Sequence, residues 1–187
     1  MHRMDACYLI TTDSVRERCT AVRALSNGLT VVFRPIEKSD QARLNDFVKS
    51  LSSESLHFRF LEIIKELPQE TLQQMCNIDY SKEIAIVVLP KNEDKIVAVA
   101  RLNMDKSWIR GEFALVVADA WQGIGLGTEL MSHVFEIARD LGLYEINFFV
   151  SWDNYKMIKL SKKMGLKIKS ADGDTLEMTS QLFSEMT

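Results

Sequence analysis

The sequence predicts an α/β domain built on a mixed sheet. Two observations carry this prediction. Three consecutive strands are expected in the middle of the chain, at 84–89, 95–104 and 109–118, and they form a meander without an intervening helix. Helices and strands then alternate toward the C-terminus, a pattern typical of α/β domains. The meander favours antiparallel pairing in part of the sheet, whereas the alternating segment is typical of parallel pairing.

Hydrophobic periodicity and turn residues predict the other elements. Strands are expected at 29–35, 145–150, 166–170 and 175–180. Helices are expected at 39–51, 55–61, 68–76, 125–141 and 153–164. The apolar runs of the central strands scarcely alternate with polar residues, so both faces of the sheet should be covered.

Length and composition indicate one ordinary globular domain. The chain has 187 residues and a formal net charge of -3, with no basic stripe that would indicate nucleic-acid binding. Its three cysteines form no metal-ligand or disulfide pattern, and no apolar run approaches the roughly 20 residues that span a membrane. We therefore expect a cytoplasmic protein without a metal, and homo-oligomer formation stays open. Residues 1–27 are expected to form an N-terminal appendage, with a short apolar piece at 7–10, and residues 28–187 the domain.

The most informative segment is the turn that follows the third strand of the meander. Gly123, Gly125 and Gly127 occupy alternate positions just before a long amphipathic helix. Glycines at this spacing let the backbone bend tightly and approach a ligand. The free N–H groups of a first helical turn attract anions. The segment therefore predicts a site for a pyrophosphate.

Several phosphate ligands are compatible with such a turn. A nucleotide P-loop requires Lys followed by Ser or Thr after the last glycine, but Thr128 and Glu129 stand there. A dinucleotide-binding fold requires its glycines near the start of a βαβ unit, and here they follow a meander. A purely structural tight turn remains the alternative.

Two motifs together resemble the GNAT acetyltransferase superfamily. Gln122-x-x-Gly125-x-Gly127 is similar to the acetyl-CoA signature of that family, Q/R-x-x-G-x-G/A. The segment 154–166 is similar to its second motif, N-x-x-A-x-x-L-Y-x-K-x-G-F. The resemblance covers residues 29–180 and implies the GNAT fold: a mixed, mostly antiparallel sheet that splays at the cofactor cleft and is flanked by helices.

The resemblance also implies which residues bind acetyl-CoA. Backbone amides of the glycine turn would hold the pyrophosphate, the preceding strand would hold the pantetheine arm, and Asn154 would face the cofactor from the opposite side. Asn154 is equally placed to cap the helix that it precedes. The residues implied are Leu115, Val116, Val117, Gln122, Gly123, Ile124, Gly125, Leu126, Gly127, Thr128 and Asn154.

Glu112 is the candidate general base. An amine must be neutral to attack a thioester, and at pH 7 only about one lysine side chain in a few thousand is neutral. Glu112 lies five residues before Val117, about 16 Å along a strand, a distance similar to the reach of a pantetheine arm. We expect partial desolvation to raise the pKa of this carboxyl. The alternative is an exposed glutamate at the start of the strand. The two histidines at 57 and 133 are expected to be structural or on the surface, with His133 facing away from the apolar stripe of its helix.

Within the superfamily, the chain resembles the bacterial Pat-type protein lysine acetyltransferases. Ser161 occupies the position where many family members have a tyrosine acid, and Pat-type enzymes lack that tyrosine. Further similar segments lie at 51–60, 77–80, 83–85, 98–101 and 111–114. The resemblance implies transfer of acetyl to a protein lysine, for example of an acyl-CoA synthetase. A small-molecule amine acetyltransferase and a non-catalytic acyl-CoA sensor are the alternatives.

Overall fold

A computed structural model of the chain describes residues 11–64 and 66–183. The first half contains α1 (Thr12–Arg18), β1 (Ala21–Ala24), β2 (Thr30–Pro35), the 3-10 turn η2 (Lys38–Asp40), α2 (Gln41–Ser50), α3 (Ser53–Phe60), α4 (Gln69–Cys76) and β3 (Glu83–Pro90). The second half contains β4 (Ala98–Met104), β5 (Arg110–Val117), η3 (Asp119–Trp121), α5 (Leu126–Asp140), β6 (Glu145–Ser151), α6 (Tyr155–Lys163), β7 (Lys167–Asp172) and β8 (Thr175–Gln181). Every helix and strand expected between residues 28 and 180 is present.

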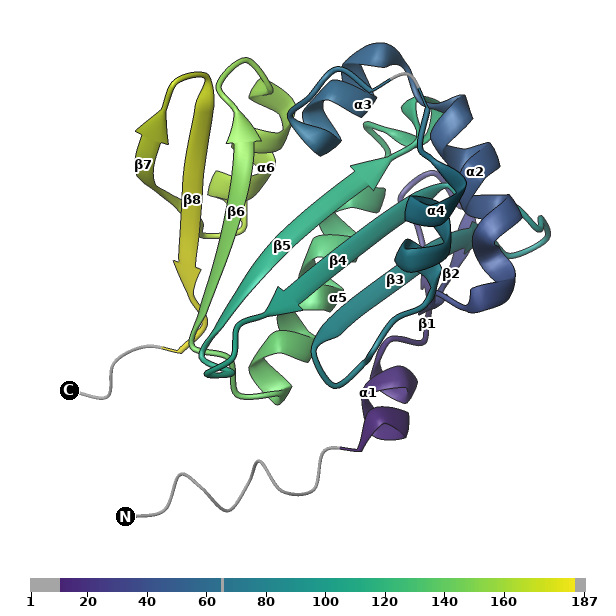
Figure 1. Ribbon diagram of the computed structural model, residues 1–187, viewed down its shortest axis with the longest axis horizontal. Helices are drawn as coiled ribbons and strands as arrows, with labels where there is room; N and C mark the ends of the chain where they lie inside the picture. The colour runs from purple at the N-terminus through teal and green to yellow at the C-terminus, as the bar shows by residue number, and fades with distance from the viewer. Residues whose placement is uncertain (1–10, 65, 184–187) are drawn as a thin grey trace.

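One sheet of eight strands runs through the molecule in the order β1-β2-β3-β4-β5-β6-β8-β7 (Figure 1). The pair β5–β6 is parallel, and every other neighbouring pair is antiparallel. This arrangement confirms the mixed, mostly antiparallel sheet predicted from the sequence.

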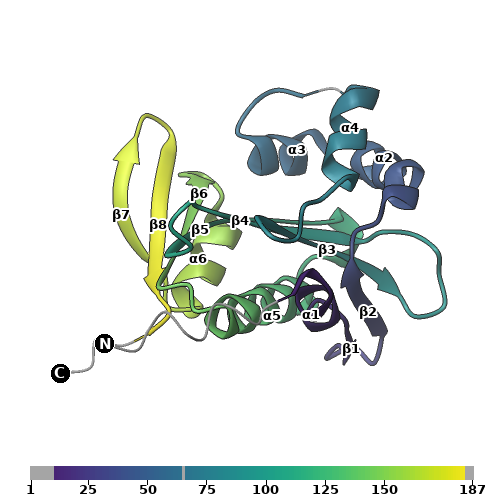
Figure 2. The ribbon, with the colours of Figure 1, turned by 60° about the horizontal axis from the view of Figure 1, so that its bottom comes forward.

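Helices cover both faces of the sheet. Figure 2 shows α2, α3 and α4 on one face, with α1 and α5 on the other. Each face has its own hydrophobic core: Leu44 of α2 and Leu72 of α4 belong to one, and Phe113 of β5 with Leu126 and Leu130 of α5 belong to the other. Successive residues of β5 point to opposite faces of the sheet. Because both faces are covered by helices, both sets of side chains are apolar, and the apolar run of β5 is not interrupted by polar residues at alternate positions.

The N-terminal segment is part of the domain from residue 11 onward. β1 pairs with β2 along the edge of the sheet, and the side chains of Val15 and Cys19 are buried in the core on the α5 face. The expected appendage is thus packed into the domain over residues 11–27. The apolar piece at 7–10 lies outside the described residues. β1 was not predicted, because Arg23 interrupts its short apolar pattern.

His133 corrects a second expectation. The side chain is buried on α5 and lies edge-on against Phe33, with ring centroids 5.5 Å apart, instead of facing solvent. Burial lowers its pKa, so the imidazole is neutral near pH 7. His133 therefore has a structural role in the core.

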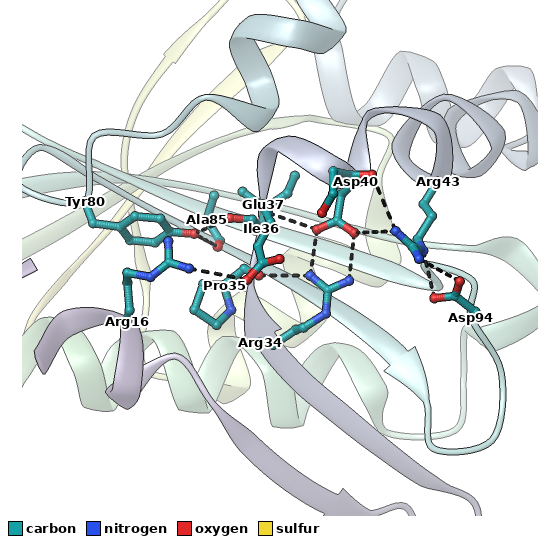
Figure 3. Close-up of polar contacts among 11 residues, drawn as sticks. Arg16, Arg34, Pro35, Ile36, Glu37, Asp40, Arg43, Tyr80, Ala85 and Asp94 are labelled. Atoms are coloured by element: carbon teal, nitrogen blue, oxygen red, sulfur yellow. Dashed lines mark hydrogen bonds and ion pairs between the residues drawn. The ribbon is translucent and has the colours of Figure 1, made fainter. Parts of the chain in front are cut away.

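A network of ion pairs joins η2, β2 and α2 (Figure 3). The carboxylate of Asp40 is inaccessible to solvent and accepts hydrogen bonds from Arg34 Nη1 and Nη2 at 2.6 and 2.7 Å. It also accepts one from the backbone N–H of Glu37 at 2.9 Å and one from Arg43 Nη1 at 3.3 Å. Arg43 reaches on to Asp94 in the β3–β4 loop. The network fixes α2 against the sheet.

The two halves of the sheet separate along the junction between β5 and β6. Their parallel pairing runs from Arg110 opposite Glu145 to Phe113 opposite Phe148 and then stops. The C-terminal part of β5 therefore has a free backbone edge on the β6 side. The splay that the resemblance implied is present.

Candidate active site

The glycine turn forms the N-terminus of α5. Gly123 and Gly125 have φ angles of 78° and 90°, in the left-handed region that strains any residue with a Cβ. Gly125 is the N-cap residue of α5, and no side chain caps the helix there. The amides of the first turn are thus left for another acceptor, and the partial positive charge of the helix end favours an anion.

A cavity of about 580 Å³ opens between this turn and the splayed strands. The free edge of β5 forms its floor, α3 borders it on one side, and α6 with Phe148 of β6 borders it on the other. Its walls are Glu54, Ser55, Phe58, Arg59, Leu115, Val116, Val117, Gln122, Gly123, Gly125, Gly127, Thr128, Phe148, Asp153, Asn154, Tyr155, Lys156, Met157 and Leu160.

Most residues predicted from the cofactor motifs line this one cavity. They are Leu115, Val116, Val117, Gln122, Gly123, Gly125, Gly127, Thr128 and Asn154. Ile124 and Leu126 do not line it: Leu126 is fully buried and Ile124 packs against the core. Only the backbone amides of these two residues are therefore candidates for contact with a ligand.

Asn154 caps α6 and also lines the cavity. Its side-chain Oδ1 accepts a hydrogen bond from the backbone N–H of Met157 at 3.1 Å, so it is the N-cap of α6. It also lies in the cavity wall. The cap fixes the direction of α6 and with it the far wall of the cavity.

A cluster of hydrogen bonds joins α3 to the glycine turn. The carboxylate of Asp119 accepts from the Ser52 amide at 2.9 Å and from the hydroxyls of Ser52 and Ser55 at 2.7 and 2.9 Å. Gln122 Nε2 donates to Ser55 Oγ at 3.2 Å and to the Val117 carbonyl at 3.1 Å. These bonds set the position of α3 relative to the turn, and so the width of the cavity.

The two cofactor motifs do not include most of the walls that α3 and α6 contribute. Phe58 and Arg59 enter the cavity from α3, and Lys156 enters it from α6. Lys156 Nζ lies 3.5 Å from Gln122 Oε1, which places a cation beside the glycine turn. The helical spacing of 54, 55, 58 and 59 was visible in the sequence, but nothing there indicated which face of α3 would meet the cavity.

Glu112 lies beside the junction but outside the large cavity. It pairs with Asn147 across β5–β6, one residue before the last pair of the parallel ladder. Its side chain is exposed, so the expected desolvation is wrong. It lines a second cavity of about 350 Å³ with Asn103, Met104, Asp105, Arg110, Glu145, Asn147, Lys169 and Glu177.

Ser161, at the position of the missing tyrosine, is not available for proton transfer. The residue is fully buried, and its hydroxyl has no hydrogen-bond partner among the described residues. It does not line the cavity, whereas Leu160 before it does. Ser161 is therefore not a candidate acid in this cavity.

The described part of the chain has neither a metal-binding cluster nor a helix that could span a membrane. Residues 11–64 and 66–183 contain no cluster of three or more histidine, cysteine or acidic side chains arranged to hold a metal ion. None of the helices in those ranges combines the length and apolarity needed to cross a membrane.

Comparison with known proteins identifies the family. The profile of the acetyltransferase (GNAT) family matches residues 49–166, more than half of the chain. An acetyltransferase of Pseudomonas aeruginosa is 31% identical over 163 residues, which cover 86% of this chain and 88% of that protein. The chain belongs to the acetyltransferase (GNAT) family.

The relatives include proteins of the Pat type. The acetyltransferase Pat of Mycolicibacterium smegmatis is 27% identical over 133 residues, which cover 71% of this chain but only 40% of that longer protein. The GNAT domain of the S. lividans PAT has the same fold, with a TM-score of 0.81, 24% identity, and coverage of 87% of this chain and 96% of that one. These similarities confirm the Pat-type resemblance.

The fold extends to enzymes with other acceptors. The spermidine N-acetyltransferase of Vibrio cholerae, solved in complex with CoA and spermine, has a TM-score of 0.68 and 18% identity, with coverage of 81% of this chain and 95% of that one. At this identity the similarity concerns the fold alone.

Proposed function

We propose that the chain binds acetyl-CoA in the large cavity and transfers acetyl directly to a primary amine, in the first place a protein lysine side chain. The observation that carries this proposal is the convergence of both sequence motifs on one cavity: the glycine turn and Asn154 lie on opposite walls of the same cleft. The Pat-type relatives favour a protein acceptor.

The cavity has suitable groups for each part of the cofactor. The amides at the N-terminus of α5, with the amine of Lys156, suit the negatively charged pyrophosphate. The free edge of β5 at Leu115–Val117 offers backbone groups to the amides of the pantetheine arm. Leu160 and Met157 supply apolar contact. The thioester would then reach the β5–β6 junction.

The second cavity suits a cationic acceptor. Four carboxylates line it, against two cations, Arg110 and Lys169. Excess negative charge concentrates ammonium groups and guides them toward Glu112. An acceptor that enters here would meet the acetyl group at the β5–β6 junction, beside Glu112.

Glu112 would act as the general base. Its carboxylate accepts a proton from the ammonium group, directly or through one water, and the neutral nitrogen attacks the thioester carbonyl. The tetrahedral intermediate collapses, the C–S bond breaks, and CoA leaves as a thiolate that takes its proton from solvent. The side chain of Glu112 is exposed and therefore accessible to an acceptor amine.

Acetyl transfer from labelled acetyl-CoA tests this function. We expect label on the lysine of an acyl-CoA synthetase and a loss of about 10²–10⁴-fold in kcat/KM for Glu112→Gln at pH 7. Glu136→Gln removes an exposed carboxylate on α5 and is the matched control, expected to be fully active. An unchanged rate for Glu112→Gln would refute the assignment of the base.

The same assay separates the alternatives. Label that appears only on spermidine or another small amine would replace the protein acceptor with a small-molecule acceptor. Binding of acetyl-CoA without transfer to any acceptor would favour the sensor.

A further inference from the structure

Arg59 is a cation in the cofactor cavity that the proposed acetyl transfer does not use. It lies on α3, which packs over β5 on the same sheet face as Glu112 and Arg101. Arg101, Glu112 and Glu83 are close enough to affect the pKa of Arg59 through their charges. Arg101 pairs with Ala114 in the β4–β5 ladder, and Ala114 follows Phe113, the last residue of β5 that pairs with β6. The proximity of Arg59 to Arg101 and Glu112 therefore places Arg59 near the β5–β6 junction.

Among residues 11–64 and 66–183, the guanidinium of Arg59 has no anionic partner of its own. Arg101 beside it is bound to Glu83 and to the backbone carbonyl of Met75. No carboxylate in residues 11–64 or 66–183 lies within ion-pair distance of Arg59, and its guanidinium rests 5.0 Å from the centroid of the Phe60 ring. Burial, followed by the charge of Arg101, lowers its pKa to about 10, so it remains charged at neutral pH. A partly buried cation without a partner is ready to bind an anion.

The position of Arg59 indicates what kind of anion would reach it. If the pyrophosphate lies at the glycine turn, a pantetheine arm that follows β5 from Val117 to Phe113 covers about 13 Å and brings the acyl group to the junction. The methyl end of an acetyl group offers nothing to a guanidinium. A carboxylate at the end of a short acyl chain would match the planar fork of arginine, which binds carboxylates through two parallel hydrogen bonds.

We propose that Arg59 binds the terminal carboxylate of a dicarboxylic acyl group, so that the chain also transfers malonyl or succinyl from the corresponding acyl-CoA. This inference rests on the proposed function, because it uses the same cofactor position. The chemistry is that of acetyl transfer: the amine nitrogen bonds to the thioester carbonyl carbon, the C–S bond breaks, and the CoA thiolate takes up a proton. The terminal carboxylate stays intact and leaves in the N-succinyl or N-malonyl product.

A carboxylate of the acceptor is a second possible source of the anion. Arg59 lines the cofactor cavity, whereas Glu112 lines the cavity assigned to the acceptor, so the acyl group is the source that the geometry favours. A third use of Arg59 would be to orient Glu112 during acetyl transfer. The experiment must separate these three cases.

Binding and transfer are measured for wild type and Arg59→Met with acetyl-CoA and succinyl-CoA, using two acceptor peptides, one without acidic residues and one with a carboxylate beside the acceptor lysine. Arg139→Met, which removes an exposed arginine at the far end of α5, is the matched control. We expect calorimetry to show tighter binding of succinyl-CoA than of acetyl-CoA by wild type. In Arg59→Met this preference, and the ratio of kcat/KM for succinyl-CoA to that for acetyl-CoA, should fall about 10- to 100-fold. Arg139→Met should leave both unchanged.

Three results would overturn the inference. The first is a wild-type protein that binds and transfers acetyl but gains no affinity for succinyl-CoA. The second is an Arg59→Met variant that loses acetyl and succinyl transfer in equal proportion, as expected if Arg59 orients Glu112. The third is a loss confined to acceptors that carry a carboxylate. In each case acetyl-CoA still binds, whereas failure of every CoA thioester to bind would refute the proposed function itself.

Discussion

Replacement of Asp40 by asparagine should destabilise the domain through its ion-pair network. Asparagine keeps one acceptor oxygen but turns an NH₂ group toward an N–H of Arg34, so one arm of the bidentate contact becomes a repulsive one. Removing one partner of a fully buried ion pair costs about 3–5 kcal/mol. The Arg34 side chain is 26% exposed, and water partly replaces the lost partner. We therefore expect a loss of about 2–3 kcal/mol at pH 7.

The loss should depend on pH in a defined direction. Burial raises the pKa of Asp40, but the hydrogen bonds from Arg34 and the Glu37 amide and the nearby positive charges hold it below its ordinary value of 3.8. A carboxyl group with a lowered pKa in the folded state stabilises the fold above the unfolded-state pKa, and this contribution is lost as the pH falls through the folded-state value. The difference between wild type and Asp40→Asn should thus be full at pH 7 and should shrink below about pH 4.

Urea unfolding followed by circular dichroism measures this difference. At pH 7 a loss of 2–3 kcal/mol corresponds to a melting temperature lower by about 5–10 °C in a domain of this size. Asp94→Asn is the matched control, because its carboxylate is 74% exposed and bonds only to Arg43 in this network, so we expect no resolvable change. Equal stability of wild type and Asp40→Asn at pH 7, or a difference that grows toward acid pH, would refute the reasoning.

Two further substitutions test other parts of the structure. Gly111→Ala should destabilise the domain by about 1–3 kcal/mol in the same urea assay, because its Cβ would lie 2.6 Å from Leu102 Cδ1 and 2.8 Å from Leu143 Cδ2; an unchanged midpoint would show that these side chains move aside freely. Lys156→Met should weaken acetyl-CoA binding about two- to tenfold at low salt and less at high salt, because a phosphate contact of an exposed amine is screened by ions. Equal affinity at every salt concentration would remove Lys156 from the phosphate site.

The order and kind of the elements followed from local sequence patterns. The glycine turn, the helix after it and the central strands all have strong local signals in the sequence. These are the glycines at 123 and 125, which adopt positive φ angles, the helical spacing of Leu130 and Val134, and the continuous apolar runs of the strands. β1 could not be predicted, because its place depends on pairing with β2 and on burial of Val15 and Cys19 against α5. The contacts of Val15 and Cys19 with α5 join segments that are more than 100 residues apart in the sequence.

The candidate site was predictable where it consists of backbone and not where it consists of side chains from separate helices. The motif residues of the turn and Asn154 meet in one cavity because a strand, a turn and two helices follow one another in the chain. Arg59 and Lys156 enter it through the packing of α3 and α6, which no spacing reveals. The exposure of Glu112 likewise depends on which helices cover its face of the sheet.

The central claim is that acetyl-CoA lies along β5 with its pyrophosphate at the N-terminus of α5. Titration of ¹⁵N-labelled protein with acetyl-CoA, followed amide by amide, tests it most directly. We expect saturable shifts concentrated at the amides of residues 122–128 and 115–117, with the amides of α4 unchanged. Saturable binding that leaves residues 122–128 unshifted, or no binding at millimolar acetyl-CoA, would contradict it.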